Sequence, residues 1–348
     1  MTLREIRLAA GKRVLDKAIV PKPLLLNSRT KILFIRYDGK IGDFFVSSFV
    51  YRELKRAYPG ITLHMVINEK LVPVVKNNRN IDGYFVMKGR SYYEIIQTAK
   101  KLKQQQYDIL VDLTPGLRNR DLLFIRLVGA AINVGYNKAD YAIFNEFITP
   151  VKDHTSRLYQ QLLEKLGVTD INAAYDIDED TTAEKNIQAF FTRHNIQKAV
   201  AVNFFGASRS RNFSQENALA ITKIVLQHYP AYTVILLTFP QVVAFTKRII
   251  EQCNTPRVTH FEDTKSIHDT VAILKHAQLL ISPDTAVVHV AGHFNIPIIA
   301  FYSDEEVNYT LWRPLTPATV LRYSENVNNI DMHAFEQQVK IMAHNVQQ

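Results

Sequence analysis

Short apolar runs of strand length alternate along the chain with longer segments in which apolar residues recur at helical spacing. In the first half, the apolar run at residues 32–35 is followed by a helical pattern over 44–58, which ends at Pro59-Gly60. The further strands predicted in this half lie at residues 61–67 and 108–113, and the further helices lie at residues 92–105 and 155–166. Because unbroken apolar strands separated by helices are typical of a parallel sheet covered on both faces, the first half predicts an α/β domain.

The second half repeats this alternation after an acidic stretch at residues 176–180. We place the domain boundary in that stretch, which gives domains of residues 1–178 and 179–348. The loops at the carboxyl ends of two such sheets are expected to face one another across a cleft, and the last helix is in a position to cross back to the first domain. The strands predicted in this half lie at residues 199–205, 233–238, 257–261, 279–282 and 296–302, and the helices begin at Ser214, Gln241, Ser266, Thr285 and Met332.

The composition is that of a globular protein. With 47% hydrophobic and 22% charged residues, a chain of 348 residues can form a core in each of two domains. The most apolar tract, residues 279–302, is interrupted by proline, aspartate and histidine, so we expect it in a folded core and not in a membrane. A single cysteine, Cys253, excludes an internal disulfide and a cysteine-rich metal site. The amino terminus has no signal-peptide pattern, so these features together predict a cytoplasmic protein.

Positive charge is concentrated in the first half of the chain. Residues 1–178 contain 28 Lys and Arg against 18 Asp and Glu, whereas residues 179–348 contain 14 against 15. Eight of the basic residues and only two acidic ones lie in residues 1–31, where Leu3, Ile6, Ala10 and Val14 have helical spacing. Such a basic amphipathic helix either lies on an anionic membrane surface or packs on its own domain with a solvated basic face. Nucleic acid is not expected as a partner, because no basic stripe is interleaved with aromatic residues.

The loop after the first strand carries the first candidate for chemistry. Ligands of open α/β sheets bind at the carboxyl ends of the strands, and Asp43 is delivered there by the turn that begins the next helix. Gly39 and Gly42 leave room for another molecule to approach the backbone. Two roles for Asp43 remain open from the pattern: it either caps the helix or acts as a catalytic acid or base.

Two loops of the second domain have the residue types that bind phosphate. The loop at residues 206–212 places Ser208 and Ser210 beside Arg209 and Arg211, and hydroxyls and guanidinium groups donate hydrogen bonds to phosphate oxygens. The alternative is a solvated basic turn.

The second of these loops begins at Ser282 and leads into a helix. We expect Asp284 to cap that helix, and we expect Thr285 and the backbone N–H groups of the first turn to form an anion site. His289 lies four residues beyond Thr285 on the same helix face, where it either faces the ligand or belongs to the apolar core.

Taken together, these motifs resemble those of glycosyltransferase family 9, the bacterial lipopolysaccharide heptosyltransferases. The resemblance rests on the order and spacing of five motifs: IGD after the first strand, YDILVDL at 107–113, VGY at 134–136, G-A-S-x-x-R from 206, and DTAVVHVAG from 284. It implies a GT-B fold of two Rossmann-like domains, with the sugar acceptor on the first and the nucleotide sugar on the second. It also implies an inverting, metal-independent transfer of heptose from ADP-heptose to the inner core of lipopolysaccharide, on an acceptor of the Kdo-lipid A type.

The resemblance assigns roles to individual residues. The catalytic acid of the family falls on Asp43, and its diphosphate-binding lysine falls on Arg211, which keeps the charge but changes its shape. The D-T-G signature of the family falls on Asp284, Thr285 and Ala286, where the methyl group of Ala286 takes the place of a glycine hydrogen. The tryptophan and proline of the family correspond to Phe213 and Ser214. These departures leave a different donor sugar open.

The remaining predictions concern the acceptor and the alternatives. We expect Lys40, Arg118, Arg120 and the Gly42 backbone to contact an anionic acceptor. Neither a cofactor nor a metal is expected: the paired carboxylates Asp176 and Asp178 lie in the linker, and the arginines and helix dipole of the second domain can stabilise the leaving diphosphate. An oxidoreductase is the less favoured alternative, because no G-x-G-x-x-G follows a predicted strand. We expect the protein at the cytoplasmic face of the inner membrane, in peripheral contact with it.

Overall fold

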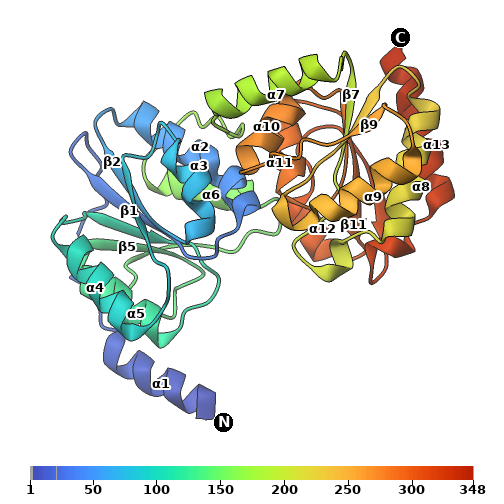
Figure 1. Cartoon of the computed structure of the whole chain (residues 1–348). Helices are drawn as coiled ribbons and strands as arrows, with labels where there is room; N and C mark the ends of the chain where they lie inside the picture. Colours follow the sequence, from blue (N-terminus) through green and yellow to red (C-terminus); the bar gives the residue numbers. More distant parts are fainter. Residues whose placement is uncertain (1–2, 21, 348) are drawn as a thin grey trace. The chain divides into compact units, whose positions relative to one another are not determined.

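The computed structural model describes residues 3–20 and 22–347, with the chain divided into two compact units, Met1–Asp176 and Ile177–Gln348 (Figure 1). Each unit contains a six-stranded sheet in which every neighbouring pair of strands is parallel. The prediction of an α/β protein built from two Rossmann-like domains is confirmed. The boundary lies at residue 176, within the acidic stretch.

The sheet of the first unit has the strand order β3-β2-β1-β4-β5-β6. Its central strand β1 pairs with β2 on one side and with β4 on the other. The strands are β1 (Lys31–Arg36), β2 (Thr62–Ile67), β3 (Gly83–Val86), β4 (Ile109–Asp112), β5 (Ile132–Tyr136) and β6 (Glu146–Ile148). The helices are α1 (Leu3–Leu15), α2 (Ile41–Ala57), α3 (Val72–Lys76), α4 (Tyr92–Lys103), α5 (Asn119–Val128) and α6 (Ser156–Lys165).

Alternation along β1 determines which helices cover which face of this sheet. Leu33 and Ile35 are buried in a core with residues of α4 and α5, which pack against each other. Phe34 points to the opposite face, where its ring meets that of Tyr51 on α2 edge to face at 5.2 Å. Because successive side chains of a strand point to opposite faces, Arg36 shares the α2 face with Phe34. Helix α6 packs against α2 on that face.

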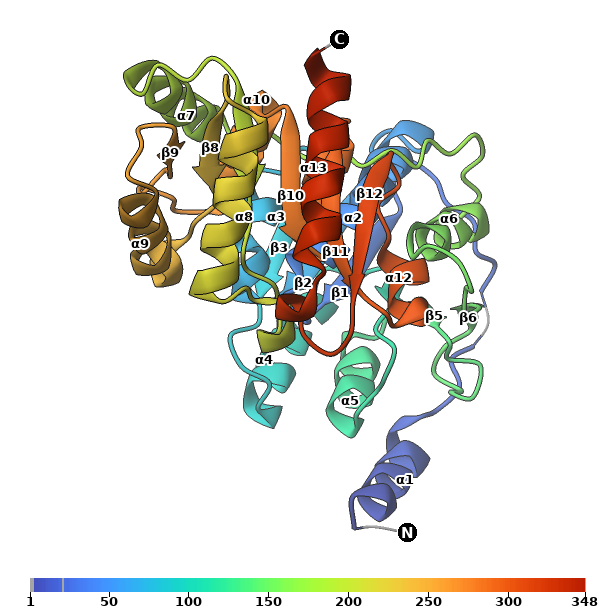
Figure 2. The same cartoon turned by 90° about the vertical axis from the view of Figure 1, so that its right-hand side faces the viewer.

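The sheet of the second unit has the order β12-β11-β10-β7-β8-β9. One face is covered by α8, α9 and α13, whose apolar residues share a core with the strands, and α13 stands beside α8 in Figure 2. The strands are β7 (Ala199–Val202), β8 (Thr233–Leu236), β9 (Val258–Thr259), β10 (Leu279–Pro283), β11 (Ile298–Ser303) and β12 (Ala318–Tyr323). The helices are α7 (Thr181–Arg193), α8 (Gln215–His228), α9 (Val243–Cys253), α10 (Ile267–His276), α11 (Ala286–His293), α12 (Glu306–Trp312) and α13 (Met332–Gln347).

The last helix was expected in a position to cross back to the first domain. In the structure α13 belongs to the second unit and packs against α8 and β12. The buried side chains of Phe335 and Val339 place its apolar face in the core of that unit.

Residues 169–174, the segment that leads out of the first unit, are bound to α2 by hydrogen bonds. The side chain of Glu53 on α2 is only 1% exposed and accepts hydrogen bonds from Arg52 and Arg56. These two arginines also donate to four backbone carbonyl oxygens, those of Thr169, Asp170, Asn172 and Ala174. The helix that carries Asp43 near its beginning therefore holds this segment near its end.

The amino-terminal helix packs on its own domain. Lys12 of α1 donates to the carbonyl oxygen of Asp140, 2.7 Å away, and its ammonium lies 4.1 Å from the ring centre of Tyr141. A side chain at Gly11 would collide with Asn119 of α5, so glycine permits this close contact. The side chains of Arg4 and Arg7 lie outside the described residues. Among the helices that the structure describes, none combines the length and the apolar character needed to cross a bilayer.

Candidate active site

Asp43 lies in the first turn of α2, directly after the carboxyl end of β1. The N-cap residue of α2 is Lys40, which has an extended backbone and whose side chain makes no capping hydrogen bond. Asp43 is therefore not the N-cap residue itself, but its carboxylate accepts a hydrogen bond from its own backbone N–H in the first turn, so it also contributes to the start of the helix. The turn before the helix depends on Gly39, whose φ of +65° disfavours other residues and whose missing side chain makes room for Asn68. Gly42 precedes Asp43 in the same first turn.

The Asp43 carboxylate is partly exposed and surrounded by charges. Its side chain is 23% exposed, and its Oδ2 lies 3.8 Å from Nζ of Lys40, whose own side chain is 65% exposed. Burial raises the pKa of Asp43 above its ordinary value, and the positive charges of Arg36 and then Lys40 offset part of that rise. A carboxylate that is reachable from solvent and has a raised pKa has the properties of a general base.

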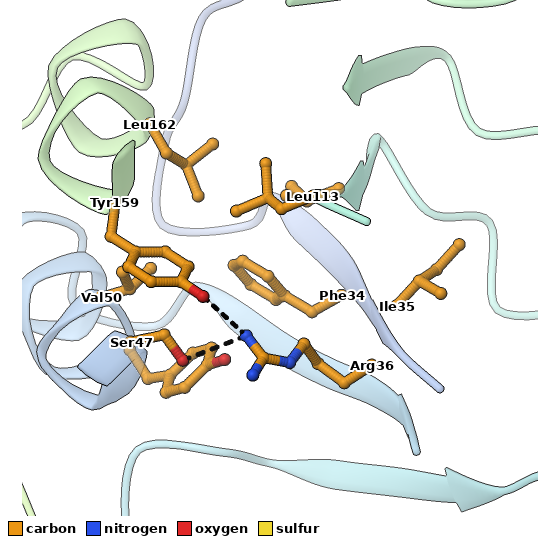
Figure 3. A pocket seen from close by; sticks show the side chains of 10 residues that line it. Phe34, Ile35, Arg36, Ser47, Val50, Leu113, Tyr159 and Leu162 are labelled. Carbon is orange, nitrogen blue, oxygen red and sulfur yellow. Dashed lines mark hydrogen bonds between the residues drawn. The ribbon is translucent and has the colours of Figure 1, made fainter. Parts of the chain in front are cut away.

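Arg36 is a charged residue near this site that sequence reasoning missed. It is the last residue of β1 and is only 7% exposed. Its Nη1 donates to the hydroxyls of Ser47 on α2, at 3.3 Å, and Tyr159 on α6, at 3.1 Å (Figure 3). The available signal was an arginine that closes an otherwise apolar strand, at the edge where ligands bind.

Three arginines gather at the carboxyl ends of β3 and β4. Arg118 is the N-cap of α5, and Arg120 lies in the first turn of that helix, where its Nη1 donates to the carbonyl oxygen of Arg90 at 3.4 Å. Arg90 forms an ion pair with Asp121, and its guanidinium lies 4.6 Å from the ring centre of Tyr37. Burial lowers the pKa of Arg90, and the neighbouring Arg120 and Arg118 lower it further.

This cluster contains two predicted residues, Arg118 and Arg120, and one that the sequence analysis missed, Arg90. The signal for Arg90 was the same as for the other two, namely a basic residue in the loop after a parallel strand. That signal was absent from the prediction because β3 was taken as a polar turn. Among the residues that the structure describes, Asp121 forms an ion pair with this cluster and the buried Asp112 also acts on Arg90 electrostatically. Three cations still outnumber these two carboxylates, so this loop region is suited to an anion.

A buried lysine holds the loop that leads to this cluster. Lys138 follows β5 and is 1% exposed, and its Nζ donates to the carbonyl oxygens of Thr114 and Pro115 at 2.7 and 3.2 Å. Asp112 at the end of β4 accepts hydrogen bonds from the backbone and the hydroxyl of Thr114. The loop before α5 is thus fixed from both sides, which positions Arg118.

In the second unit, the loop after β7 is folded around a glycine. A side chain at Gly206 would collide with Cβ of Arg211, so only glycine allows this close turn. The Gly206 N–H donates to the side chain of Asn212, 2.7 Å away. The hydroxyls of Ser208 and Ser210 lie 2.8 Å apart, and Arg209 is exposed beside them. Ser214, where a helix was predicted to begin, is the N-cap of α8, and its side chain accepts a hydrogen bond from the backbone N–H of Asn217.

Arg211 is held by the loop after β10. Its Nη1 lies 2.9 Å from Oδ2 of Asp284, which also accepts a hydrogen bond from Asn308 at 3.1 Å. Burial raises the pKa of Asp284, and Arg211 opposes that rise. The prediction that Asp284 caps α11 is wrong, because Thr285 occupies the N-cap position and Asp284 is used to orient Arg211. The two predicted phosphate loops are nevertheless brought together through this pair.

The first turn of α11 adjoins this ion pair. Thr285 has an extended backbone and makes no capping hydrogen bond, and its hydroxyl lies 3.3 Å from Nδ2 of Asn203. Ala286 begins the helix. His289, one turn later, is 3% exposed, and its ring is buried with its centre 6.3 Å from that of the Trp312 ring. A direct contact of His289 with a donor stays a prediction.

A known family describes most of this chain. Residues 95–340 match the family described as glycosyltransferase family 9 (heptosyltransferase). This chain belongs to glycosyltransferase family 9. The matched segment includes Arg118, Arg211 and the loop around Thr285, so the resemblance inferred from the motifs is confirmed.

Individual members of the family and solved structures agree with this assignment. The chain is 27% identical over 293 residues to the Escherichia coli K12 protein named "Putative lipopolysaccharide heptosyltransferase 4", with 81% of this chain and 78% of that protein covered. The crystal structure of a family 9 glycosyltransferase from Veillonella parvula matches with a TM-score of 0.76 at 19% identity, over 93% of this chain and 100% of the other. The E. coli ADP-heptose lipopolysaccharide heptosyltransferase II matches with a TM-score of 0.73 at 14% identity, over 92% and 100%.

Family membership decides between the reaction classes that the sequence left open. This family 9 protein is a glycosyltransferase, so the oxidoreductase alternative is wrong. The two solved structures establish the GT-B fold. Across the residues that the structure describes, no three His, Cys, Asp or Glu side chains gather in a way that would hold a metal ion.

Proposed function

We propose that this family 9 glycosyltransferase transfers heptose from ADP-heptose, with inversion and without a metal ion, to the inner core of lipopolysaccharide, on an acceptor of the Kdo-lipid A type. The observation that carries the proposal is the pairing of the two phosphate loops through Arg211 and Asp284 beside the first turn of α11. The names of the curated relative and of the similar E. coli structure support heptose as the sugar and ADP-heptose as the donor.

In this proposal Asp43 is the general base. Its carboxylate accepts the proton of an acceptor hydroxyl while that oxygen attacks the anomeric carbon and the bond from this carbon to the diphosphate breaks. General-base assistance of this kind accelerates a reaction by roughly 10²- to 10⁴-fold. The position of Asp43 after the central strand, with a partly exposed carboxylate, supports the assignment.

The leaving diphosphate would be stabilised by the second domain. Arg211 has five N–H donors, and its contacts with Asp284 are made by Nη1 alone, so Nε and Nη2 are the donors for phosphate oxygens. Thr285 and the N–H groups at the start of α11 add hydrogen bonds and the positive end of the helix dipole. Ser208 and Arg209 lie on the same loop as Arg211 and complete the proposed donor site. These positive groups supply the charge stabilisation that a divalent metal provides in other transferases.

The acceptor would be bound by the first domain. Arg118, Arg120 and Arg90 present guanidinium groups suited to phosphate or carboxylate, and Lys40 lies beside Asp43. An inner-core acceptor is anionic, which matches this charge. Gly42 keeps the backbone beside Asp43 accessible to a sugar.

We propose that the enzyme works in the cytoplasm at the inner membrane, where a lipid-linked acceptor is available during its assembly. The basic segment before β1 supports a peripheral contact, with exposed cations at Arg13, Lys17 and Lys22 next to exposed apolar side chains at Val14 and Val20.

The decisive experiment is incubation of the purified protein with ADP-heptose and a heptose-deficient core acceptor, followed by mass spectrometry of the acceptor. A gain of one heptose, retained in excess EDTA, is the expected result. A loss of activity in EDTA that Mg²⁺ restores would contradict the metal-free mechanism. A gain of another sugar, when a mixture of nucleotide sugars is supplied, would identify a different donor for the same fold.

A further inference from the structure

A buried guanidinium lies one helical turn from the proposed catalytic base. The hydrogen bond from Arg36 Nη1 to Ser47 places the guanidinium against α2 at position 47. Residues four apart on a helix are neighbours on one face, so Asp43 lies on this same face of α2, one turn before Ser47. The hydroxyl of Tyr159 holds the same nitrogen from α6 (Figure 3). Two elements therefore fix the position of this charge.

Hydrogen bonding alone does not account for a charge at this place. Nη1 makes both of these hydrogen bonds, whereas Nε and Nη2 are buried and have no hydrogen-bond partner. The nearest carboxylate contact of Nε is with Asp38 at 3.9 Å, which is an ion pair and not a hydrogen bond. Burying a cation with unmatched donors costs stability. An apolar residue of similar size would avoid that cost, which points to a use of the charge itself.

The surroundings make the field of this charge strong. Beside the guanidinium lies a small cavity of about 10 Å³, room for about one water molecule, lined mostly by apolar and aromatic side chains. Phe34, Leu113 and Leu162 form part of this lining (Figure 3). Because little water can enter, the charge of Arg36 is screened much less than that of the exposed Lys40.

We propose that Arg36 is a positioning residue of the transfer reaction, whose fixed and buried charge acts through space on the Asp43 carboxylate and favours the ionised form that accepts the proton of the acceptor. This inference rests on the proposed role of Asp43 as general base. It adds a residue that makes no contact with either substrate and that acts only through Asp43.

The charged and titratable groups around Asp43 agree with this role. Burial raises the pKa of Asp43, and Arg36 opposes that rise more than Lys40 does, while Asp38 adds to it. Tyr51 on α2 and Tyr159 on α6 also face Arg36. Burial raises the pKa of Tyr51, and it raises that of Tyr159 to about 12, so both phenols are neutral where the enzyme works. Arg36 is thus the less screened of the two cations that act on Asp43.

The test measures the ionisation of Asp43 directly and through the reaction. Protein labelled with ¹³C at aspartate carboxyl groups is titrated by NMR, and the Asp43 resonance is identified by its loss in Asp43→Asn. In Arg36→Met we expect Asp43 to titrate at higher pH than in the parent, with the acidic limb of the kcat profile moved in the same direction. Arg36→Lys retains the charge and should keep the titration near that of the parent. Asp38→Asn, which removes the opposing carboxylate, should move it to lower pH.

An unchanged Asp43 titration in Arg36→Met would overturn the proposal, whatever the effect on rate. If that variant does not fold, Arg36→Gln retains a polar head for Ser47 and Tyr159 and provides the same comparison. A uniform loss of kcat at all pH values with an unmoved limb would indicate a merely structural role and would also overturn it. If the titration moves but Asp43→Asn remains active, the proposed role of Asp43 as base has failed, whereas the electrostatic link between the two residues stands.

Discussion

The Nη1 atom of Arg211 lies 2.9 Å from Oδ2 of Asp284. Arg211, the residue proposed to bind the diphosphate, is therefore held in place by a neighbouring carboxylate. The side chain of Asp284 is 8% exposed and that of Arg211 28%, which leaves the arginine as the accessible member of the pair. Part of the entropic cost of ordering a long side chain on ligand binding is avoided in this way. The same carboxylate repels phosphate, so the pair gains orientation at the expense of net charge.

From this arrangement we predict that Arg211→Ala and Thr285→Val each weaken the binding of ADP by about 1 to 3 kcal/mol, the range expected when a hydrogen bond to a charged group is lost. Isothermal titration calorimetry measures this directly. Arg193→Ala is the matched control, because it removes an exposed arginine from the same unit. An ADP affinity that is unchanged in both site variants would place the nucleotide elsewhere.

For Asp43→Asn we predict a loss of transferase rate of roughly 10²- to 10⁴-fold, with ADP affinity retained. The amide has nearly the same shape as the carboxylate but does not accept the proton. Asp140→Asn, a change at an exposed aspartate of the same unit, should leave the rate unchanged. If Asp43→Asn keeps a rate within a few-fold of the parent, Asp43 is not the base.

Much of the fold could be predicted from hydrophobic pattern alone. The central strands β1, β4, β7 and β10 are short apolar runs, and their burial on both faces is what makes the pattern visible. Strands nearer the sheet edges, such as β3 and β12, are only half-buried over most of their length and gave no such pattern. Neither β3 nor β12 was therefore predicted as a strand.

Site residues that lie in a sequence motif could be predicted. Site residues that are brought into place only by the fold could not. Asp43, Arg211 and Thr285 stand in recognisable loops. Arg36 and Arg90 acquire their place from contacts between elements far apart in sequence, such as the bond of Arg36 to Tyr159 and the ion pair of Arg90 with Asp121. Asp284 was wrongly predicted to cap a helix for the same reason. Its actual partner, Arg211, lies 73 residues away in the sequence, so the local pattern around Asp284 does not indicate the contact.

Glu53 provides a test of the segment that leaves the first domain. We predict that Glu53→Gln lowers the free energy of unfolding by about 2 to 4 kcal/mol, because it removes a buried carboxylate from two arginines that remain. Urea unfolding monitored by circular dichroism measures this. Glu164→Gln breaks the exposed pair with Arg157 and should cost less than about 1 kcal/mol.

The Glu53 effect should also depend on pH. Burial raises the pKa of Glu53, but hydrogen bonds from Arg56, Arg52 and the Asn172 backbone lower it by more, so the pKa in the folded protein lies below its ordinary value of 4.5. The stabilisation is therefore fully present above pH 4.5 and is lost as the pH falls through the folded-state pKa. The difference between parent and Glu53→Gln should shrink over that range. A difference that is constant from pH 7 to pH 3 would contradict this account.

For the acceptor side we predict that Arg118→Gln and Arg120→Gln each raise the KM for the core acceptor roughly ten-fold or more, while the KM for the donor is unchanged. Steady-state kinetics with either substrate varied separates the two effects. Arg126→Gln is the matched control, since this arginine is exposed on the same helix in its last turn. An equal effect of all three substitutions would show that only the net charge of the domain matters.

The last prediction concerns the amino-terminal segment and its contact with lipid. Each basic residue near an anionic surface contributes about 1 kcal/mol of attraction, so we expect the intact protein to sediment with anionic liposomes at low salt and to be released at high salt. Lys12 holds α1 on its own domain, so it is left unchanged in the test. Arg13→Gln, Lys17→Gln and Lys22→Gln together remove three exposed charges next to exposed apolar side chains.

The triple variant should stay in solution while it still turns over a delipidated acceptor at the parent rate. Its matched control carries Lys185→Gln, Lys223→Gln and Lys340→Gln, which remove the same charge from exposed positions of the second unit. Because a local basic surface attracts lipid more than a dispersed charge does, the control should sediment like the parent. If both triple variants lose liposome binding equally, net charge alone drives the association; if neither does, the segment before β1 is not the anchor.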